Sequence, residues 1–382
     1  MIQPIDLAIL LIIGLVQWRI TVLWLRALQP HSAWRFAIFT LDAIFAAGWL
    51  LKLVPAMGGP TVPGGLSLAL RSSILAYGIG ATAVLILKML LQPLRRKAAK
   101  QFSPTRRRLI TAAGNIAMAT PIAALAYGAF IERLDFQVRE LDVPVAGLPD
   151  DLEGLRILHL SDIHLSPFLS ESDFARVIDA ANGLHPHLAA VTGDFISQSG
   201  DPLDACIRQV ARLKADAGVF GCLGNHEHYA RVEDYAAAAA GRLGVPILRK
   251  QSLTLRFGQA TLNLAGVDYQ PFYPRRDYLR GAEKLIVPGA TNLLLSHSPD
   301  VFPVAAQQGF NLMLSGHTHG GQVSVEILDQ AINPVRFLTP YVHGLYRHAS
   351  ATAYVTRGIG TIGIPARIGA PPEISLLRLR KA

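Results

Sequence analysis

The stretch RILHLSDIH, residues 156–164, places a short apolar run directly before an aspartate and a histidine. A run of this length between polar residues is typical of a buried strand in a sheet that is covered on both faces. In extended chain, residues i and i+2 point the same way, so Asp162 and His164 can face one point. The stretch therefore predicts a strand whose carboxyl end carries reactive side chains.

The chain after residue 155 repeats this pattern of short apolar runs separated by amphipathic segments. The alternation predicts an α/β domain with a mainly buried sheet and helices on its faces. Gly258-Gln259, between two alternating runs, predicts a hairpin turn. We expect strands at 156–161, 188–193, 218–223, 261–267, 291–296 and 311–315, and helices at 170–184, 202–215, 231–243 and 299–308.

Polar side chains follow five of these strands, at the point where each strand ends. Because ligands in α/β folds gather beyond the carboxyl ends of strands, we expect these side chains to lie close together. By the same i, i+2 alternation, His317 and His319 also face one point. The set consists of Asp162, His164, Asp194, Asn225, His297, His317 and His319, with His226 next to Asn225.

Seven oxygen and nitrogen donors are the number and type that two divalent cations need. Imidazole with carboxylate suits Mn, Fe, Zn or Ni, and a set without cysteine argues against a structural zinc site. Two such ions about 3.5–4 Å apart orient a phosphate and lower the pKa of a bridging water. The alternative is that these side chains are core polar groups whose hydrogen bonds are satisfied within the protein.

These elements closely resemble the motifs of the calcineurin-like metallophosphoesterase family, over roughly residues 155–380. A narrower likeness is to its membrane-attached bacterial branch, the YkuE/YaeI-like phosphoesterases. The resemblance implies layered β-sheets flanked by helices, and phosphoester hydrolysis by a metal-bound hydroxide. The family motifs are Asp162-x-His164, Gly193-Asp194, Gly224-Asn225-His226-Glu227, His297 and Gly316-His317-x-His319, and the branch is indicated by residues 317–322, 354–360 and 371–374.

The resemblance also implies a role for each position of the set. One metal would be bound by Asp162, His164 and His319. Asp194 would bridge both metals. The second metal would be completed by Asn225, His297 and His317.

His226 resembles the family's non-ligand histidine, which contacts the phosphate and protonates the leaving oxygen. A structural or substrate-orienting role for His226 is the alternative. The family often has a second aspartate shortly after the bridging one, where this chain offers Ser197. This departure puts the usual hydrogen-bond support of the metal site in question.

The first third of the 382-residue chain has the composition of a membrane region. Residues 1–131 hold 13 Lys and Arg against 2 Asp and Glu, a net charge of +11, whereas the rest of the chain carries −2. Positive charge confined to a hydrophobic region indicates basic loops beside membrane spans, so we expect no nucleic-acid binding. Stretches apolar and long enough to cross a bilayer lie at 5–26, 35–56, 72–93 and 109–131.

Basic residues cluster in the expected links between spans one and two and between spans three and four, which places both links in the cytoplasm. The fourth span then delivers the following domain to the extracytoplasmic side of a bacterial-type inner or plasma membrane. The predicted organisation is a transmembrane region of four helices at 1–134, a linker at 135–154 and a metallophosphoesterase domain at 155–382. In that exported domain Cys206 and Cys222 would form either a disulfide or two buried thiols.

Arg275 and Arg276 lie in a stretch rich in aromatic residues, from Tyr269 to Arg280. Arginines among aromatic side chains can contact lipid headgroups or a substrate phosphate. An ordinary loop over the sheet is the alternative.

The sequence thus predicts a membrane-anchored dinuclear-metal phosphoesterase that hydrolyses a phosphomonoester or phosphodiester, lipid-linked or derived from the envelope. One alternative is a non-catalytic, metal-dependent membrane sensor or assembly protein. If the domain faces the cytoplasm, a UDP-diacylglucosamine-type pyrophosphate hydrolase is another. The sequence does not indicate the oligomeric state.

Overall fold

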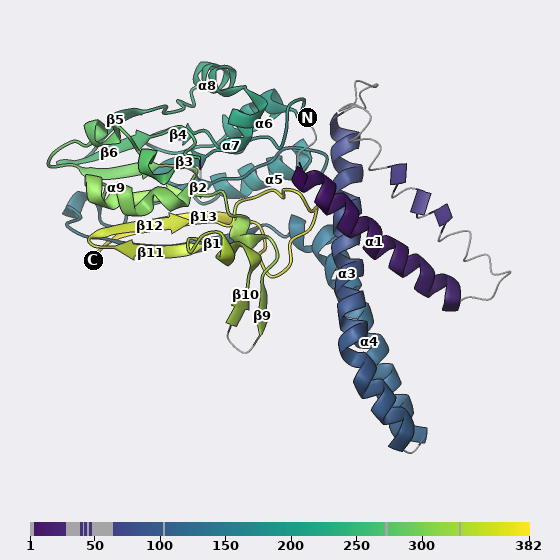
Figure 1. Ribbon diagram of the computed structural model, residues 1–382. Coiled ribbons are helices and arrows are strands. Elements are labelled where there is room, and N and C mark those ends of the chain that lie inside the picture. The colour runs from purple at the N-terminus through teal and green to yellow at the C-terminus, as the bar shows by residue number, and fades with distance from the viewer. Residues whose placement is uncertain are drawn as a thin grey trace. The chain divides into compact units, whose positions relative to one another are not determined.

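Figure 1 shows the computed structural model of the chain. The structure describes residues 4–27, 39–40, 42–43, 46–47, 64–101, 104–271, 274–327 and 330–382. By its internal contacts the chain divides into two units. A helical unit comprises Met1–Phe130 with Gly363–Ala366, and an α/β unit comprises Ile131–Ile362 with Arg367–Ala382.

Among its described residues, the helical unit contains three long helices. They are α1 (Pro4–Ala27), α3 (Gly64–Gln101) and α4 (Pro104–Phe130), and α3 packs against both of the others. The predicted spans 5–26, 72–93 and 109–131 fall on these helices, while most of the predicted span 35–56 lies outside the described residues. The basic link expected after residue 93 is not a loop, because α3 continues through it to Gln101 on residues that favour helix.

Only part of the membrane prediction is tested by these helices. Within the described ranges, Ser72–Pro93 is the one helical segment that is long and apolar enough to cross a bilayer. The prediction of four membrane-spanning helices is therefore not confirmed.

The α/β unit is built on two sheets that stack face to face (Figure 1). In the first sheet, β2, β3 and β4 run parallel and β13 runs antiparallel to β2. Its strands, in spatial order, are β1 (Gln137–Val145), β13 (Glu373–Lys381), β2 (Arg156–Leu160), β3 (Leu188–Thr192) and β4 (Val219–Cys222).

The second sheet has a parallel centre and antiparallel edges. Strands β6, β7, β8 and β12 are parallel, whereas β5 and β11 are antiparallel to their neighbours. A separate two-stranded ribbon joins β9 (Val325–Ile327) to β10 (Gln330–Ile332). The order of the second sheet is β11 (Gly344–His348), β12 (Ala351–Val355), β8 (Leu312–Ser315), β7 (Thr291–Leu295), β6 (Ala260–Gly266) and β5 (Gln251–Phe257).

Helices cover the outer face of each sheet and leave an apolar layer between the sheets. Ile157 and Leu188 of the first sheet meet Leu264 and Leu293 of the second in that central layer. The first sheet packs outward against α5 (Glu171–Asn182), α6 (Leu203–Val210) and α8 (Glu233–Arg242), and the second against α9 (Phe302–Gln308). The layered α/β architecture with flanking helices is thus confirmed.

The predicted strands and helices of the α/β unit all form, within a few residues of the expected bounds, and the Gly258-Gln259 hairpin joins β5 to β6. The segment expected as a linker, 135–154, contains a strand in its first half. Gln137–Val145 forms β1, paired in parallel with β13 along its whole length. Pro144 argued against a strand, but β1 is an edge strand, where a missing N–H costs no ladder hydrogen bond.

A buried arginine ties together the loops at one end of the α/β unit. The Arg367 side chain is fully buried, and it donates hydrogen bonds to backbone carbonyls. Its acceptors are the carbonyl oxygens of Gly360, Arg357, Gly358, Ala370 and His319, at donor–acceptor distances of 2.6, 2.9, 3.2, 2.9 and 3.3 Å. The guanidinium is thus a donor to all five carbonyl groups, of which those of Gly358 and His319 also accept from the backbone N–H groups of Glu373 and Gln322.

Replacing Arg367 with Met should lower the free energy of unfolding by about 3 kcal/mol or more, because several buried carbonyls lose their donor at once. The matched control is Arg378→Met, which removes a half-exposed arginine paired with Asp142 at 2.6 Å. That control should cost less than about 1 kcal/mol. Urea unfolding of both variants measures the difference, and equal losses would contradict the role given to Arg367.

Candidate metal centre

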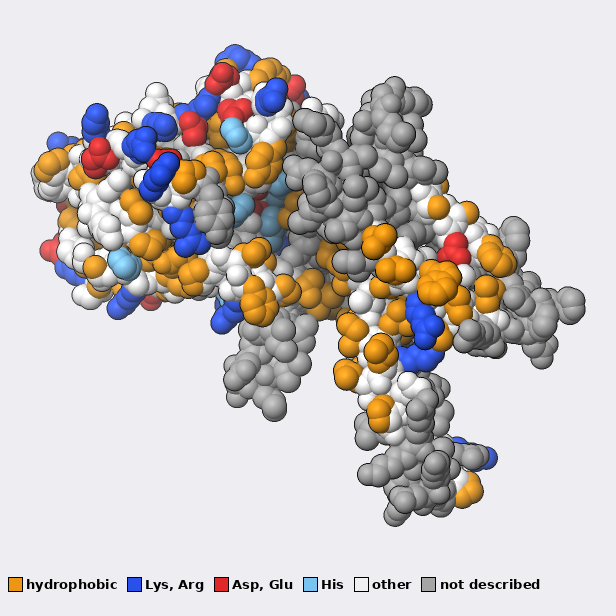
Figure 2. Space-filling model, viewed as in Figure 1, with side chains coloured by type: hydrophobic (Ala, Val, Ile, Leu, Met, Phe, Trp, Pro, Cys, Tyr) orange, Lys and Arg blue, Asp and Glu red, His pale blue; other side chains and the backbone are white. Residues whose placement is uncertain are grey.

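The predicted site residues meet where the parallel strands of both sheets end. Strands β2, β3 and β4 of the first sheet, and β7 and β8 of the second, each run directly into a loop that carries them. On the face shown in Figure 2, histidine side chains gather in a recess of the α/β unit. All eight residues predicted as ligands or proton donor lie in the segments that follow these strands, with Asn225 and His226 opening a short helix and His319 a 3₁₀ turn.

The loops turn sharply at the site, with the backbone in the left-handed region. Asp162, His164, Asp194, His317 and His319 have φ angles of 51°, 50°, 54°, 75° and 53°. Side-chain orientation here is thus not set by strand alternation, which had been the basis for expecting Asp162 and His164, or His317 and His319, to face one point. Non-glycine residues held in this conformation cost free energy and are often found at functional sites.

Two glycines allow these loops to approach closely. A Cβ atom on Gly224 would overlap the Asp194 carboxylate, and one on Gly316 would overlap the side chains of Asp162 and Ser161. The glycines of the sequence motifs therefore make room for the neighbouring carboxylates.

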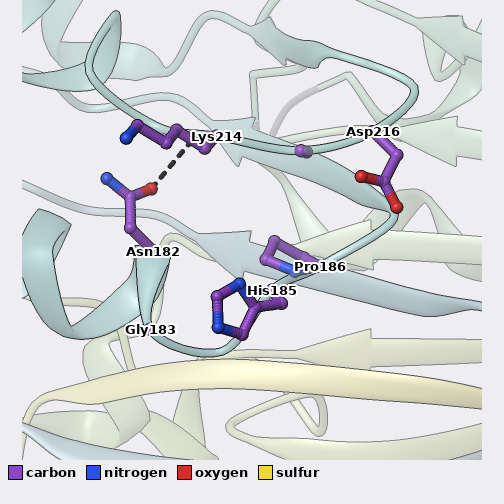
Figure 3. Close-up of a pocket in the computed structure, with 7 residues that line it drawn as sticks. Asn182, Gly183, His185, Pro186, Lys214 and Asp216 are labelled. Atoms are coloured by element: carbon purple, nitrogen blue, oxygen red, sulfur yellow. Dashed lines mark hydrogen bonds between the residues drawn. The ribbon is translucent and has the colours of Figure 1, made fainter.

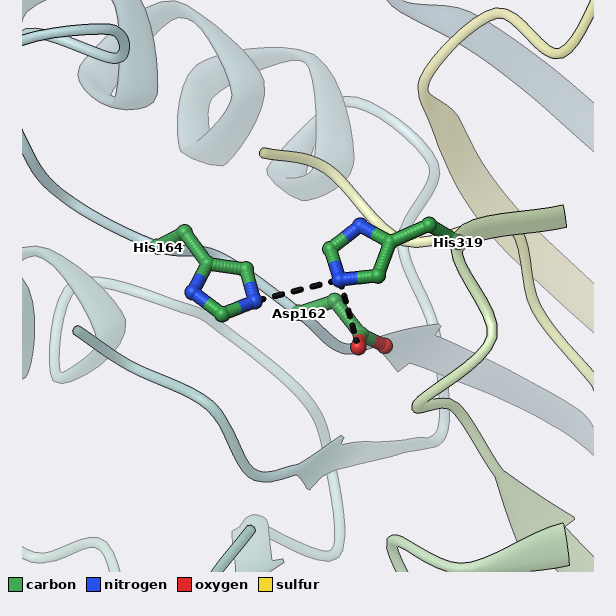
Figure 4. A group of neighbouring side chains, drawn as sticks. All are labelled: Asp162, His164 and His319. Atoms are coloured by element: carbon green, nitrogen blue, oxygen red, sulfur yellow. Dashed lines mark hydrogen bonds and ion pairs between the residues drawn. The ribbon is translucent and has the colours of Figure 1, made fainter. Parts of the chain in front are cut away.

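One cluster of polar atoms consists of Asp162, His164 and His319 (Figure 4). The Nε2 atoms of the two histidines lie 3.1 Å apart, and the His319 Nε2 lies 3.3 Å from Asp162 Oδ1. All three side chains are buried. Their facing atoms are close enough together to bind one cation.

A second cluster consists of Asp194, His297 and His317, with Asn225 beside it. The His297 Nε2 lies 3.0 Å from Asp194 Oδ2, 3.1 Å from His317 Nδ1 and 3.0 Å from Asn225 Oδ1. Asp194 Oδ2 is also 3.5 Å from His164 Nε2, which links the two clusters. His317 and His319 thus belong to different clusters, although they are only two residues apart.

The hydrogen bonds of two histidines define which ring nitrogen faces the clusters as an acceptor. His164 Nδ1 lies 3.1 Å from the Ile196 carbonyl oxygen, and His297 Nδ1 lies 2.7 Å from that of Thr192. Because a carbonyl only accepts, each Nδ1 carries hydrogen and each neutral ring presents a lone pair on Nε2. These lone pairs point at carboxylate and amide oxygens, which are also acceptors. A divalent cation between them would remove the repulsion, so the residues present fit a metal.

The electrostatics of the clusters agree with ligation by neutral imidazole. Burial lowers the pKa of His164 and His319 well below the usual histidine value, and it lowers the pKa of His317 to about 4. Burial also acts to lower the pKa of His297, but the contact with Asp194 outweighs it and raises that pKa to about 9. Of these four histidines, His297 is therefore the one that carries a second ring proton near neutral pH. That proton lies beside Asp194, where a cation would sit.

His226 lies at the edge of these clusters and is half-exposed. Its Nδ1 donates to the carbonyl oxygen of Ser197 at 2.6 Å, and its backbone N–H donates to Asp194 Oδ1 at 2.9 Å. A nitrogen of its ring lies within 4.8 Å of the facing atoms of His164 and Asp194. Ser197 thus supports His226 through its backbone, and Asp201 holds Ser197 by accepting from its N–H at 2.9 Å.

Glu227 is the residue whose contribution the sequence did not reveal. Its buried carboxylate accepts backbone N–H groups of Asp194, Phe195 and Gly224, at 2.9, 2.8 and 2.9 Å. It thereby fastens the turn after β3 to the start of α7 (Asn225–Ala230). Burial and the nearby Asp194 carboxylate raise the pKa of Glu227 to about 7. Its position inside a family motif was the only available signal.

Arg275 and Arg276 are exposed on a short 3₁₀ turn, η3 (Arg275–Asp277). Arg275 lies close enough to Asp300, three residues after His297, to lower the pKa of that carboxyl, although burial raises it overall. Substrate contact by either arginine stays a prediction. Cys206 and Cys222 are both buried and unlinked, so the structure shows two thiols rather than a disulfide.

A cavity of about 460 Å³ lies elsewhere on the α/β unit (Figure 3). Asn182, His185 and Lys214 are among its lining residues, and the Lys214 N–H donates to Asn182 Oδ1 at 2.8 Å. The segment from Asn182 to Pro186 precedes β3, so this cavity is at the amino end of that strand. It contains none of the predicted site residues.

Replacing Glu227 with Gln should lower the free energy of unfolding by about 1–3 kcal/mol, because an NH₂ group would then face backbone N–H donors. Glu233→Gln is the control, since Glu233 makes a partly exposed pair with His228 at 2.7 Å. Its cost should stay below about 1 kcal/mol. Urea unfolding compares the two, and an unchanged Glu227→Gln protein would show that the three N–H groups do not need the carboxylate.

Comparisons with known proteins agree with this site. Residues 155–321 match the family model described as calcineurin-like phosphoesterase. The uncharacterized metallophosphoesterase YkuE of Bacillus subtilis is 30% identical over 258 residues, which cover 66% of this chain and 89% of that protein. The uncharacterized metallophosphoesterase Cj0846 of Campylobacter jejuni is 33% identical over 251 residues, covering 64% of this chain and 63% of that protein.

A transmembrane protein with metallophosphoesterase domain from Danio rerio is 31% identical over 258 residues, or 64% of this chain. The chain spans 58% of the length of that relative. The residues that the family model matches, 155–321, include both polar clusters. The chain belongs to the calcineurin-like metallophosphoesterase family.

Proposed function

We propose that the protein is a membrane-anchored phosphoesterase with a dinuclear metal centre, acting on a phosphomonoester or phosphodiester. The observation that carries this proposal is the pair of buried acceptor clusters that share Asp194. One metal would be held by Asp162, His164, Asp194 and His319, and the other by Asp194, Asn225, His297 and His317. The metals would be of the Mn, Fe or Zn class, given imidazole and carboxylate ligands.

When bound, two divalent cations in such a site neutralise phosphate charge and make a water nucleophilic at neutral pH. The chain's own residues would do the rest. The hydrogen bond from Nδ1 of His226 to the Ser197 carbonyl fixes the ring and leaves Nε2 as the nitrogen that would exchange a proton with the substrate. We assign to His226 the protonation of the leaving oxygen, and to Arg275 and Arg276 a contact with the anionic substrate.

The apolar segment Ser72–Pro93 and the names of relatives support a membrane anchor. The four-span topology, with the enzyme domain on the extracytoplasmic side, rests on the distribution of basic residues in the first third of the chain. A domain tethered to a bilayer on that side would meet lipid-linked or envelope phosphoesters. We therefore propose this class of substrate.

Replacing Asp194 with Asn should abolish Mn²⁺-stimulated hydrolysis of bis(p-nitrophenyl) phosphate and reduce Mn²⁺ binding, because one carboxylate is shared by both clusters. The control is Asp179→Asn, which alters an exposed carboxylate paired with Arg212. Equilibrium dialysis and initial rates, both on the full chain, measure the two effects. Wild-type protein that binds two metals but hydrolyses no ester in a broad panel would favour a metal-dependent sensor instead.

Replacing His226 with Ala should lower kcat about 10²–10⁴-fold on an ester with an alkoxide leaving group. The loss should be much smaller with p-nitrophenolate, which leaves without needing a proton. His185→Ala, a change at the cavity of Figure 3, serves as the control and should affect neither rate. Equal losses on both esters would assign His226 to substrate orientation rather than proton donation.

A reporter enzyme fused after Ala382 should be active only if that reporter works outside the cytoplasm. The expected result follows from an even number of spans and cytoplasmic basic links. Paired fusions to a periplasmic and a cytoplasmic reporter measure it. Activity of the cytoplasmic reporter would overturn the orientation and bring a nucleotide-linked lipid substrate back into consideration.

A further inference from the structure

Two histidines form the accessible part of the candidate metal centre. Of the eight residues assigned to ligation and proton transfer, six are buried, and His226 and His317 are partly exposed. Since the buried six cannot be reached directly from solvent, a substrate must approach over His226 and His317. The side chains next to these two histidines therefore border the entrance.

Two tyrosines, one from a helix and one from a loop, occupy that border. Tyr229, on α7, has its ring centroid 6.0 Å from that of His226. Tyr269, which follows β6, has its ring centroid 6.1 Å from that of His317 and 6.5 Å from that of His297. The two rings lie 6.1 Å apart at an angle of 77°, and their hydroxyl oxygens are 3.4 Å apart. Each tyrosine thus flanks one of the two accessible histidines.

The exposure of this pair indicates a surface for contact rather than for packing. Tyr229 is 65% exposed, so its ring contributes little to the core. Tyr269 is half-buried, and its ring lies near those of His297 and His317. The Tyr229 ring meets His226 edge to face at 67°, the Tyr269 ring meets His297 at 66°, and Tyr229 stays open to a further partner. Aromatic rings bind other rings in offset or edge-to-face geometry, beyond the effect of buried area alone.

We propose that Tyr229 and Tyr269 determine substrate specificity by binding an aromatic ring on the group attached to the phosphate. This inference rests on the proposed function, because the phosphate must sit at the metal clusters for its substituent to reach the tyrosines. Tyr229 adjoins His226, which places the ring of the substrate on the leaving-group side. The substrate class is thus a phosphoester whose leaving group carries an aromatic ring close to the phosphate.

The test uses phosphonates, which mimic the phosphate group but cannot be hydrolysed. Binding of methylphosphonate, cyclohexylphosphonate and phenylphosphonate to the Mn²⁺-loaded full chain is measured by calorimetry, independently of catalysis. The wild type should bind phenylphosphonate about tenfold more tightly than methylphosphonate and about threefold more tightly than cyclohexylphosphonate.

Tyr229→Ala and Tyr269→Ala should each reduce the preference for phenylphosphonate to about twofold and leave methylphosphonate binding unchanged. Tyr229→Phe and Tyr269→Phe should retain the preference, because the ring and not the hydroxyl makes the contact. Tyr235→Ala is the matched control, since Tyr235 is an exposed tyrosine on α8 whose hydroxyl donates to Asp204 at 2.8 Å.

Three results would overturn the proposal. An unchanged preference in both alanine variants would show that the tyrosines do not contact the substituent, and an equal weakening of all three phosphonates would make them structural supports of the metal centre. Cyclohexylphosphonate binding as tightly as phenylphosphonate would show selection for apolar bulk instead of an aromatic ring. If no phosphonate binds the metal-loaded wild type, the proposed phosphate site itself fails, which separates that outcome from a failure of the tyrosine contact alone.

Discussion

The close packing of buried histidine rings around the Asp194 carboxylate is the constraint on which this structure depends. The Nε2 atoms of His164 and His297 point at Asp194 from two directions, at 3.5 and 3.0 Å. In a low-dielectric interior such an arrangement is unfavourable unless a positive charge lies between the groups. A fold that holds these atoms in place has to fix them from behind, and the rest of the site does so.

The groups that hold the site are mostly backbone atoms. Carbonyl oxygens of Ile196, Thr192 and Ser197 accept from the Nδ1 atoms of three histidines and thereby orient the rings. The Glu227 carboxylate performs the complementary task by accepting backbone N–H groups. Arg367 holds the segment that carries His319 by donating to the carbonyl oxygens of His319 and Gly360. Orientation of metal-facing atoms by such outer contacts is what metal sites generally need.

The two parts of the chain differ in net charge, and each charge bears on a different property. The net +11 of residues 1–131 bears on orientation in a membrane, whereas the remaining chain is close to neutral at −2. Attraction of an anionic phosphoester by the α/β unit therefore has to be local. The charge of bound divalent cations, with arginines near the site, supplies it in the proposed mechanism.

The sequence by itself determined six strands between Arg156 and Ser315, the main helices that separate them and the identity of the polar residues at the strand ends. Apolar runs that end just before Asp162, Asp194 or His297 involve only residues that are neighbours in the chain. Such patterns can be recognised from one sequence without knowledge of the fold. The sequence could not show that Gln137–Val145 pairs with Glu373–Lys381, because that partner lies more than two hundred residues away and Pro144 weakened the pattern. Nor could it separate His317 from His319, because their left-handed backbone overrides strand alternation. Tertiary structure alone decided that Tyr229 and Tyr269 meet at the entrance, since proximity between this helix and this loop depends on how the two sheets stack.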